Sequence, residues 1–199
     1  MKADHKQLTT KIIGGKFRGK KILLPSKCVT RSSKSRLRES LFDTLQFDVV
    51  GKYFIEMFGG SGSVGLEAIS RGAKQAWFIE LDRNSFKTLQ ANCRSLDPSR
   101  CDIRFGDAFV VLPDILSELK REKEKAYIYI DPPFSIREGY NDIYTKVINT
   151  IAHIDPEVVH LIVVEHMTKY DFPETIGPFE KVKEKKFGKS SLSYYAIVE

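Results

Sequence analysis

Residues 54–68 read Phe-Ile-Glu-Met-Phe-Gly-Gly-Ser-Gly-Ser-Val-Gly-Leu-Glu-Ala, an apolar run that passes through glycines into an amphipathic segment. Gly60, Gly62 and Gly65 have the spacing G-x-G-x-x-G between a predicted strand and a predicted helix. Glycines at these positions permit a tight turn and let backbone N–H groups approach a ligand closely. The segment therefore predicts a strand, a ligand-binding loop and a helix, in that order.

Strand and helix patterns alternate on both sides of this segment. Strands are expected at 53–58, 75–79, 103–105, 126–130 and 158–164, and helices at 64–71, 84–95, 109–121 and 142–152. Two alternating runs, 180–187 and 192–198, follow and predict a hairpin. The order predicts an α/β fold with a mostly parallel seven-stranded sheet, helices on both faces and a C-terminal antiparallel hairpin.

Carboxylates at three strand ends decide between two cofactors. Glu80 follows the loop by about 20 residues, where it can accept from ribose hydroxyls, and so completes a fingerprint that also fits NAD. Glu56 would face the pyrophosphate of a dinucleotide, but it can pair with the ammonium group of a methionine moiety. Asp107 can accept from the amino group of an adenine. Each carboxylate alone suits a helix cap or an ion pair, but the three together favour S-adenosylmethionine.

The strand expected at 126–130 ends in Asp131-Pro132-Pro133-Phe134. The two prolines stiffen the chain and remove two backbone donors, so the carboxylate and carbonyl oxygens face outward beside an aromatic ring. This pocket suits the exocyclic amine of a planar base, which donates to Asp131 and to the Pro132 carbonyl while Phe134 stacks on the ring. The nitrogen lone pair then points toward an electrophilic methyl group. A rigid loop after a buried strand is the structural alternative.

These motifs, in this order and spacing, resemble the S-adenosylmethionine-dependent amino-methyltransferases. More narrowly, residues 12–19 (Ile-Ile-Gly-Gly-Lys-Phe-Arg-Gly), 36–42 (Arg-Leu-Arg-Glu-Ser-Leu-Phe) and 62–73 (Gly-Ser-Val-Gly-Leu-Glu-Ala-Ile-Ser-Arg-Gly-Ala) resemble the bacterial RsmD family. The resemblance spans nearly the whole chain. It implies a Rossmann-like methyltransferase fold and methylation of N2 of one guanine in small-subunit (16S) ribosomal RNA.

The resemblance also implies roles for individual residues. The glycine loop would hold the methionine end of the cofactor, Glu80 the ribose and Asp107 the adenine. The family more often has Asp where this chain has Glu56 and Ala where it has Gly59, which leaves the direct contact of Glu56 with the cofactor open. The predicted cofactor site comprises Glu56, Phe58, Gly59, Gly60, Ser61, Gly62, Glu80, Leu81, Asp107 and Ala108, and the catalytic site comprises Asp131, Pro132, Pro133 and Phe134.

The N-terminal residues carry most of the positive charge. Residues 1–38 contain twelve Lys and Arg and one acidic residue, a net charge of +11, whereas the remaining 20 basic and 25 acidic residues give −5. Short apolar runs in 12–25 predict paired strands, and a helix follows from residue 35. We therefore expect residues 1–50 to form a basic RNA-binding extension and 51–199 the catalytic domain. The expected RNA contacts are Lys16, Arg18, Lys20, Lys21, Arg31, Arg36 and Arg38, with a weaker second candidate in Lys181, Lys183, Lys185, Lys186 and Lys189.

Composition excludes several other classes of protein. The chain has 199 residues, 42% hydrophobic and 29% charged, with no apolar run near the roughly 20 residues that a membrane span needs, so a cytoplasmic protein is expected. Three cysteines without C-x-x-C spacing indicate neither disulfides nor zinc, and the four histidines are too scattered to indicate a metal. His166 follows Glu165 at a strand end and is a candidate pocket residue. Nothing requires a dimer, so a monomer is expected.

Three other functions remain open. A DNA adenine-N6 methyltransferase shares the Asp-Pro-Pro-Phe motif, but such enzymes normally need a separate target-recognition region. An NAD-dependent oxidoreductase fits the glycine loop and leaves Asp131 to Phe134 unexplained. A catalytically silent RNA-binding protein of the same fold would bind cofactor without turnover. The expected partner is ribosomal RNA, either naked or in an assembling subunit.

Overall fold

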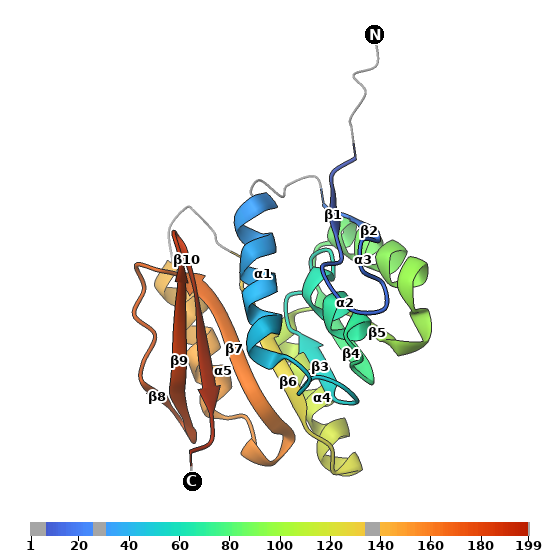
Figure 1. The fold of residues 1–199 in the computed structure, drawn as a ribbon. Helices are drawn as coiled ribbons and strands as arrows, with labels where there is room; N and C mark the ends of the chain where they lie inside the picture. The colour runs from blue at the N-terminus through green and yellow to red at the C-terminus, as the bar shows by residue number, and fades with distance from the viewer. Residues whose placement is uncertain (1–6, 26–30, 134–139, 199) are drawn as a thin grey trace.

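The structure, a computed structural model, describes residues 7–25, 31–133 and 140–198 (Figure 1). Its helices are α1 (Arg31–Leu45), α2 (Ser63–Ser70), α3 (Arg83–Leu96), α4 (Ala108–Glu122) and α5 (Tyr140–Ala152), with two short 3-10 helices, η1 (Pro98–Arg100) and η2 (Pro156–Val158). Its strands are β1 (Thr9–Lys11), β2 (Lys21–Leu23), β3 (Tyr53–Glu56), β4 (Gln75–Glu80), β5 (Cys101–Phe105), β6 (Ala126–Ile130), β7 (Val159–Met167), β8 (Thr175–Ile176), β9 (Phe179–Phe187) and β10 (Ser190–Ala196).

The main sheet has the order β5-β4-β3-β6-β7-β10-β9-β8. The first five strands of this order pair in parallel, and β10 pairs antiparallel with both β7 and β9. The predicted α/β fold, parallel sheet and C-terminal hairpin are therefore confirmed. The sheet has eight strands, one more than predicted. The additional strand is β8, which has two residues and pairs with β9 at the edge of the sheet.

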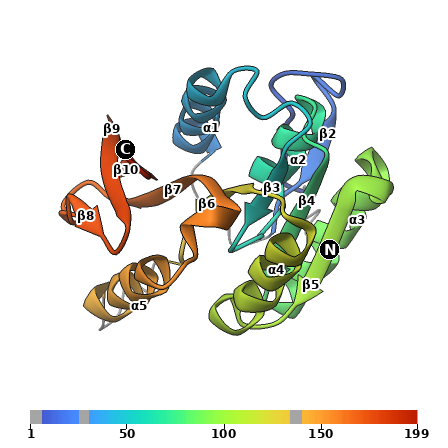
Figure 2. The ribbon, with the colours of Figure 1, turned by 90° about the horizontal axis from the view of Figure 1, so that it is seen from below.

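Helices cover both faces of the sheet, as Figure 2 shows. Alternation along the central strand β3 explains this, because neighbouring side chains of a strand point to opposite faces. Tyr53 and Ile55 join a buried cluster with α4 and α5, whereas Phe54 joins a second cluster with α1, α2 and α3. A strand buried on both faces reads as a continuous apolar run, which is the pattern that marked it in the sequence.

The N-terminal extension packs into the second of these clusters. β1 and β2 form a separate antiparallel pair, and residues 12–20 connect them, so the predicted paired strands are present but shorter than the apolar pattern indicated. Ile12 and Ile22 are buried with Leu41 and Phe42 of α1 against Phe54 of β3. The predicted boundary between an extension of residues 1–50 and a catalytic domain of residues 51–199 stays a prediction. Side chains from both sides of this boundary pack in the same buried cluster.

No helix within the described ranges is both long enough and apolar enough to cross a membrane.

Candidate active site

The glycine loop lies between β3 and α2, at the carboxyl ends of the parallel strands. Gly60 and Gly62 have φ of +53° and +75°, values that side-chain-bearing residues rarely adopt. A Cβ on Gly60 would meet no atom within 4 Å, so this side of the loop is open, whereas one on Gly65 would lie 2.4 Å from the Phe78 ring. Two of these glycines therefore shape the turn, and Gly65 lets α2 pack closely on β4.

Glu80 holds the loop in place from the end of β4. Its Oε2 accepts from the backbone N–H of Gly60 at 2.7 Å, and its Oε1 accepts from that of Asp82 at 2.7 Å. A carboxylate that is fixed in this way keeps further lone pairs for hydroxyl donors. Glu80 is therefore held in a fixed orientation and can still accept hydrogen bonds from ribose hydroxyls.

The cleft beside Glu80 also contains the predicted cofactor residues Phe58, Gly60, Leu81, Asp107 and Ala108, whereas Glu56, Gly59 and Ser61 line a second pocket. Asp107 is the N-cap of α4, and its Oδ1 accepts from the backbone N–H of Phe109 at 2.9 Å. The helix-cap interpretation is therefore correct for Oδ1, and Oδ2 can accept from a ligand. Apolar side chains form the walls. The lining includes Phe58, Gly60, Ile79, Glu80, Leu81, Asp107, Ala108, Phe109, Asp131, Pro133 and Ile143.

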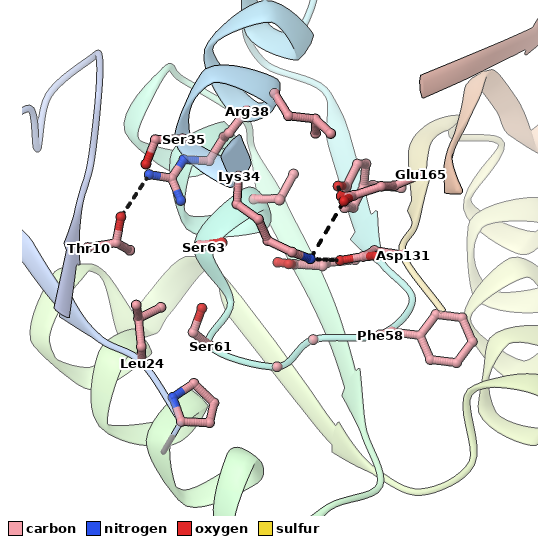
Figure 3. A pocket seen from close by; sticks show the side chains of 17 residues that line it. Thr10, Leu24, Lys34, Ser35, Arg38, Phe58, Ser61, Ser63, Asp131 and Glu165 are labelled. Atoms are coloured by element: carbon pink, nitrogen blue, oxygen red, sulfur yellow. Dashed lines mark hydrogen bonds and ion pairs between the residues drawn. The ribbon is translucent and has the colours of Figure 1, made fainter. Parts of the chain in front are cut away.

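A second pocket on the other side of the loop is acidic. Glu56 ends β3, is buried, and accepts from the backbone N–H of Gly65 at 2.8 Å. Burial raises the pKa of Glu56 to about 8. Asp131 follows β6 and Glu165 lies in β7, and both line the same pocket (Figure 3). Because β3, β6 and β7 are neighbours in parallel, their carboxyl ends bring three acids together.

Lys34 of α1 reaches into this pocket between two of the acids, as Figure 3 shows. Its Nζ lies 2.6 Å from Asp131 Oδ2 and 3.6 Å from Glu165 Oε1. The hydroxyl of Tyr129 donates to Glu165 Oε2. Burial, with the charge of Asp131 second, raises the pKa of Glu165 to about 7. The pocket is thus an acceptor-rich site that already holds an N–H donor.

His166 was a candidate pocket residue from the sequence, but it does not line the acidic pocket or the cofactor cleft. His166 and Glu165 are neighbours in β7, so their side chains point to opposite faces. His166 is buried on the other face, with Nε2 2.8 Å from Ser193 Oγ and its ring against Phe172. Glu165 takes the pocket position. Its place at the end of a buried strand was the signal that should have identified it.

The predicted basic residues separate into two groups. Lys16, Arg18, Lys20 and Lys21 of the extension are exposed, and so is Arg36 of α1. Arg38 is 4% exposed and donates to the Lys11 carbonyl at 2.7 Å, with Nε 3.6 Å from Glu67 Oε2. A side chain enclosed in this way is unavailable to RNA phosphates, so its assignment to the basic surface is corrected. The Arg31 side chain and Phe134 lie outside the described residues.

The second candidate surface on the terminal hairpin is partly used within the fold. Lys185 donates to Ser40 Oγ and Thr44 Oγ1 at 2.9 and 2.8 Å, which ties β9 to α1. Lys181 pairs with Glu174 at 2.6 Å. The remaining lysines of this group, Lys183, Lys186 and Lys189, are exposed.

Buried polar side chains attach the extension to the helices behind the glycine loop. Glu67 of α2 accepts from the backbone N–H groups of Ile13 and Gly14, both at 2.8 Å. Asn92 of α3 accepts from Leu23 N–H at 2.8 Å and donates to the carbonyl of Ser61, in the loop itself, at 2.8 Å. The basic hairpin and the ligand loop are therefore joined through one side chain.

Comparisons with known proteins agree with this geometry. A family model described as conserved hypothetical protein 95 matches residues 10–196. Ribosomal RNA small subunit methyltransferase D of Escherichia coli (strain K12) is 31% identical over 186 residues, which cover 93% of this chain and 88% of that protein. A solved structure of a candidate methyltransferase from Escherichia coli, yhhF, is 28% identical with a TM-score of 0.73, covering 94% of this chain and 97% of that one.

A more distant structure shows the same fold with a ligand bound. SMU.776, a candidate methyltransferase solved in complex with SAH, has a TM-score of 0.68 at 15% identity and covers 98% of this chain and 57% of that one. This likeness concerns the fold.

Proposed function

Because the chain belongs to the RsmD family, to which ribosomal RNA small subunit methyltransferase D gives its name, we propose that it transfers a methyl group from S-adenosylmethionine to the N2 amine of a guanine in small-subunit ribosomal RNA. The predicted family and the Rossmann-like methyltransferase fold are thereby confirmed, and S-adenosylmethionine is the cofactor. An amine as the methyl acceptor is supported above all by one observation, the contact of the Lys34 ammonium group with the Asp131 carboxylate at 2.6 Å. The choice of guanine N2 follows from the family.

The residues around the glycine loop fit this cofactor. Gly60 lines both the acidic pocket and the cleft that contains Glu80 and Asp107, so one elongated ligand can pass over the loop from one to the other. The open space at Gly60 leaves room for the ligand backbone. Glu56 and Asp131 would face its ammonium and sulfonium end, Glu80 its ribose and Asp107 its adenine. A dianionic pyrophosphate would meet the buried acids instead, which disfavours NAD.

The chain contributes mainly position and charge to the reaction. The bound cofactor supplies an electrophilic methyl group on a sulfonium. Asp131 and the carbonyl of Pro132 accept the two N–H bonds of the guanine amine and turn its lone pair toward that group. Methyl transfer to the amine would place positive charge on its nitrogen, and Asp131 is positioned to stabilise this charge and to take the proton that leaves. Lys34 must move away from Asp131 before the amine enters.

Methyl incorporation tests the proposal directly. Purified protein with labelled S-adenosylmethionine is incubated with small-subunit particles, naked 16S ribosomal RNA and adenine-containing duplex DNA. We expect label in ribosomal RNA, as particle or as naked chain, and none in DNA. Label in DNA alone would favour an adenine methyltransferase, and cofactor binding without any label would favour a silent RNA-binding protein.

The exposed cations of the extension predict a separable RNA-binding effect. Changing Lys16, Arg18 and Lys20 to Gln should weaken RNA binding and flatten its salt dependence, by about 0.7 to 0.9 in log–log slope for each phosphate that the variant no longer neutralises. Filter binding at several salt concentrations measures both effects. Calorimetry should show an unchanged affinity for S-adenosylhomocysteine.

A matched variant carries Lys183→Gln, Lys186→Gln and Lys189→Gln, which removes the same charge from the terminal hairpin. We expect it to change the salt slope less than the variant of the extension does. Equal slopes for the two variants would contradict a specific role of the extension, and joint loss of RNA and cofactor binding would mean that the extension is structural.

The role of Glu80 predicts a change in cofactor affinity. Glu80→Ala should weaken binding of S-adenosylhomocysteine by about 10- to 100-fold. The variant lacks the carboxylate that accepts hydrogen bonds from the ribose and from the Gly60 amide. Calorimetric titration measures this, with NAD as a second ligand that should not bind. Glu122→Ala, an exposed glutamate of α4, is the control and should bind as the wild type does. Binding of NAD in preference to S-adenosylhomocysteine would overturn the cofactor assignment.

A further inference from the structure

Glu165 is placed to contact the same ligand group as Asp131. Lys34 Nζ lies within 3.6 Å of oxygens from both carboxylates, so the two acids face one donor position (Figure 3). Glu165 is 1% exposed, and its Oε1 has no hydrogen-bond partner among the residues that the structure describes. This oxygen has the ion pair with Lys34 at 3.6 Å but no hydrogen bond within the described part of the chain, so it can accept from a further donor that enters the pocket.

The orientation of Glu165 is fixed from behind. The hydroxyl of Tyr129 donates to Oε2, which directs Oε1 into the pocket. Tyr129 lies in β6 two residues before Asp131, and Glu165 lies in the neighbouring β7, where Tyr129 pairs with Val163 and Ile130 with Val164. The sheet register therefore sets both acids side by side.

Two adjacent acceptors distinguish the purine bases. Guanine carries two kinds of donor side by side, N1–H and the N2 amine, whereas adenine has an amine beside N1, whose lone pair is an acceptor. Two carboxylates therefore match the guanine edge, and one of them would face a lone pair on adenine. Resting on the function proposed above, we infer that Glu165 accepts the N1–H of the target guanine while Asp131 holds the N2 amine, and that Glu165 thereby selects guanine.

2-Aminopurine tests this contact, because it keeps the 2-amine but has a lone pair at N1 in place of N1–H. It also lacks O6, and comparing each variant with the wild type on both bases removes that common difference. The target guanosine is first mapped in small-subunit RNA and then replaced by 2-aminopurine through ligation, and the RNA is assembled with small-subunit proteins. The rate constant kcat/KM for methyl transfer is measured on both substrates with the full-length protein. The wild type should prefer guanine.

Glu165→Gln should lower the guanine-to-2-aminopurine ratio of kcat/KM by about tenfold or more. The amide of Gln is close to isosteric, still accepts from Tyr129, and can turn to donate to the lone pair at N1. Comparing ratios removes the different reactivity of the two amines and any general loss of activity. Tyr129→Phe, which releases Glu165 without removing it, is the second variant and should lower the ratio by a smaller factor.

Glu122→Gln is the matched control, since it makes the same Glu-to-Gln change at an exposed position of α4. It should leave both rate constants, and therefore their ratio, as in the wild type. An unchanged ratio in both Glu165→Gln and Tyr129→Phe, with guanine still methylated at N2, would overturn the role of Glu165 alone. Absence of N2 methylation by the wild type would overturn the proposed function and this inference with it.

Discussion

Asp131→Ala should lower methyl transfer to ribosomal RNA by about 10²- to 10³-fold, the usual cost of removing one group that stabilises developing charge in a closed site. Asp131 follows β6, lines both the acidic pocket and the cofactor cleft, and already meets an ammonium group at 2.6 Å. Without it the guanine amine loses its charged acceptor, and Lys34 loses the shorter of its ion pairs with Asp131 and Glu165.

Single-turnover transfer from labelled S-adenosylmethionine to small-subunit RNA measures this effect. Asp131→Asn keeps one acceptor oxygen and should lie between the alanine variant and the wild type. Asp114→Ala removes an exposed carboxylate of α4 and should retain the wild-type rate. Wild-type incorporation by Asp131→Ala would show that this carboxylate does not hold the amine.

The second large effect concerns stability, at Glu67. Glu67→Ala should lower the free energy of unfolding by about 3–5 kcal/mol, the range found when one partner of a buried charged pair is removed. Glu67 is 0% exposed and accepts from two backbone amides of the extension and from Arg71 Nε at 2.9 Å. Its loss leaves those donors without their acceptor and removes the carboxylate that pairs with the buried Arg38.

Urea unfolding followed by circular dichroism measures the stability change. Glu122→Ala is the control and should differ from the wild type by less than about 0.5 kcal/mol, as exposed substitutions usually do. Hydrogen exchange should also become faster at the amides of Ile13 and Gly14, because these lose their acceptor. Unchanged exchange at these amides would mean that the apolar contacts of Ile12 and Ile22 hold the extension without Glu67.

Periodicity and glycine spacing predicted most of the fold. The strand at 126–130 has the same bounds in the structure, and the helix predicted at 64–71 differs from α2 by one residue at each end. These elements are strongly marked because buried parallel strands are apolar throughout and the helices between them are amphipathic. β8 was not predicted, because a strand of two residues has no periodicity to detect.

The candidate site was only partly visible in the sequence. Residues that end a strand, such as Glu80 and Asp131, could be placed because the carboxyl ends of parallel strands share one edge. Arg38, Glu67 and Asn92 could not, because their partners lie 27 to 69 residues away and depend on tertiary packing. Charge counting treated Arg38 as surface, although an arginine beside a glutamate in a buried cluster is a structural ion pair.

The identity of the methylated nucleotide tests the central claim most directly. Small-subunit particles from a strain lacking this protein are treated with the purified protein and S-adenosylmethionine. The RNA is digested to oligonucleotides for mass mapping of the modified position, and to nucleosides for chromatography and mass spectrometry that identify the modified base. The account predicts one new N2-methylguanosine, at a position that is unmodified in the strain without the protein and modified in its parent. A new methylated adenosine, or no new methylated nucleoside in RNA, would contradict it.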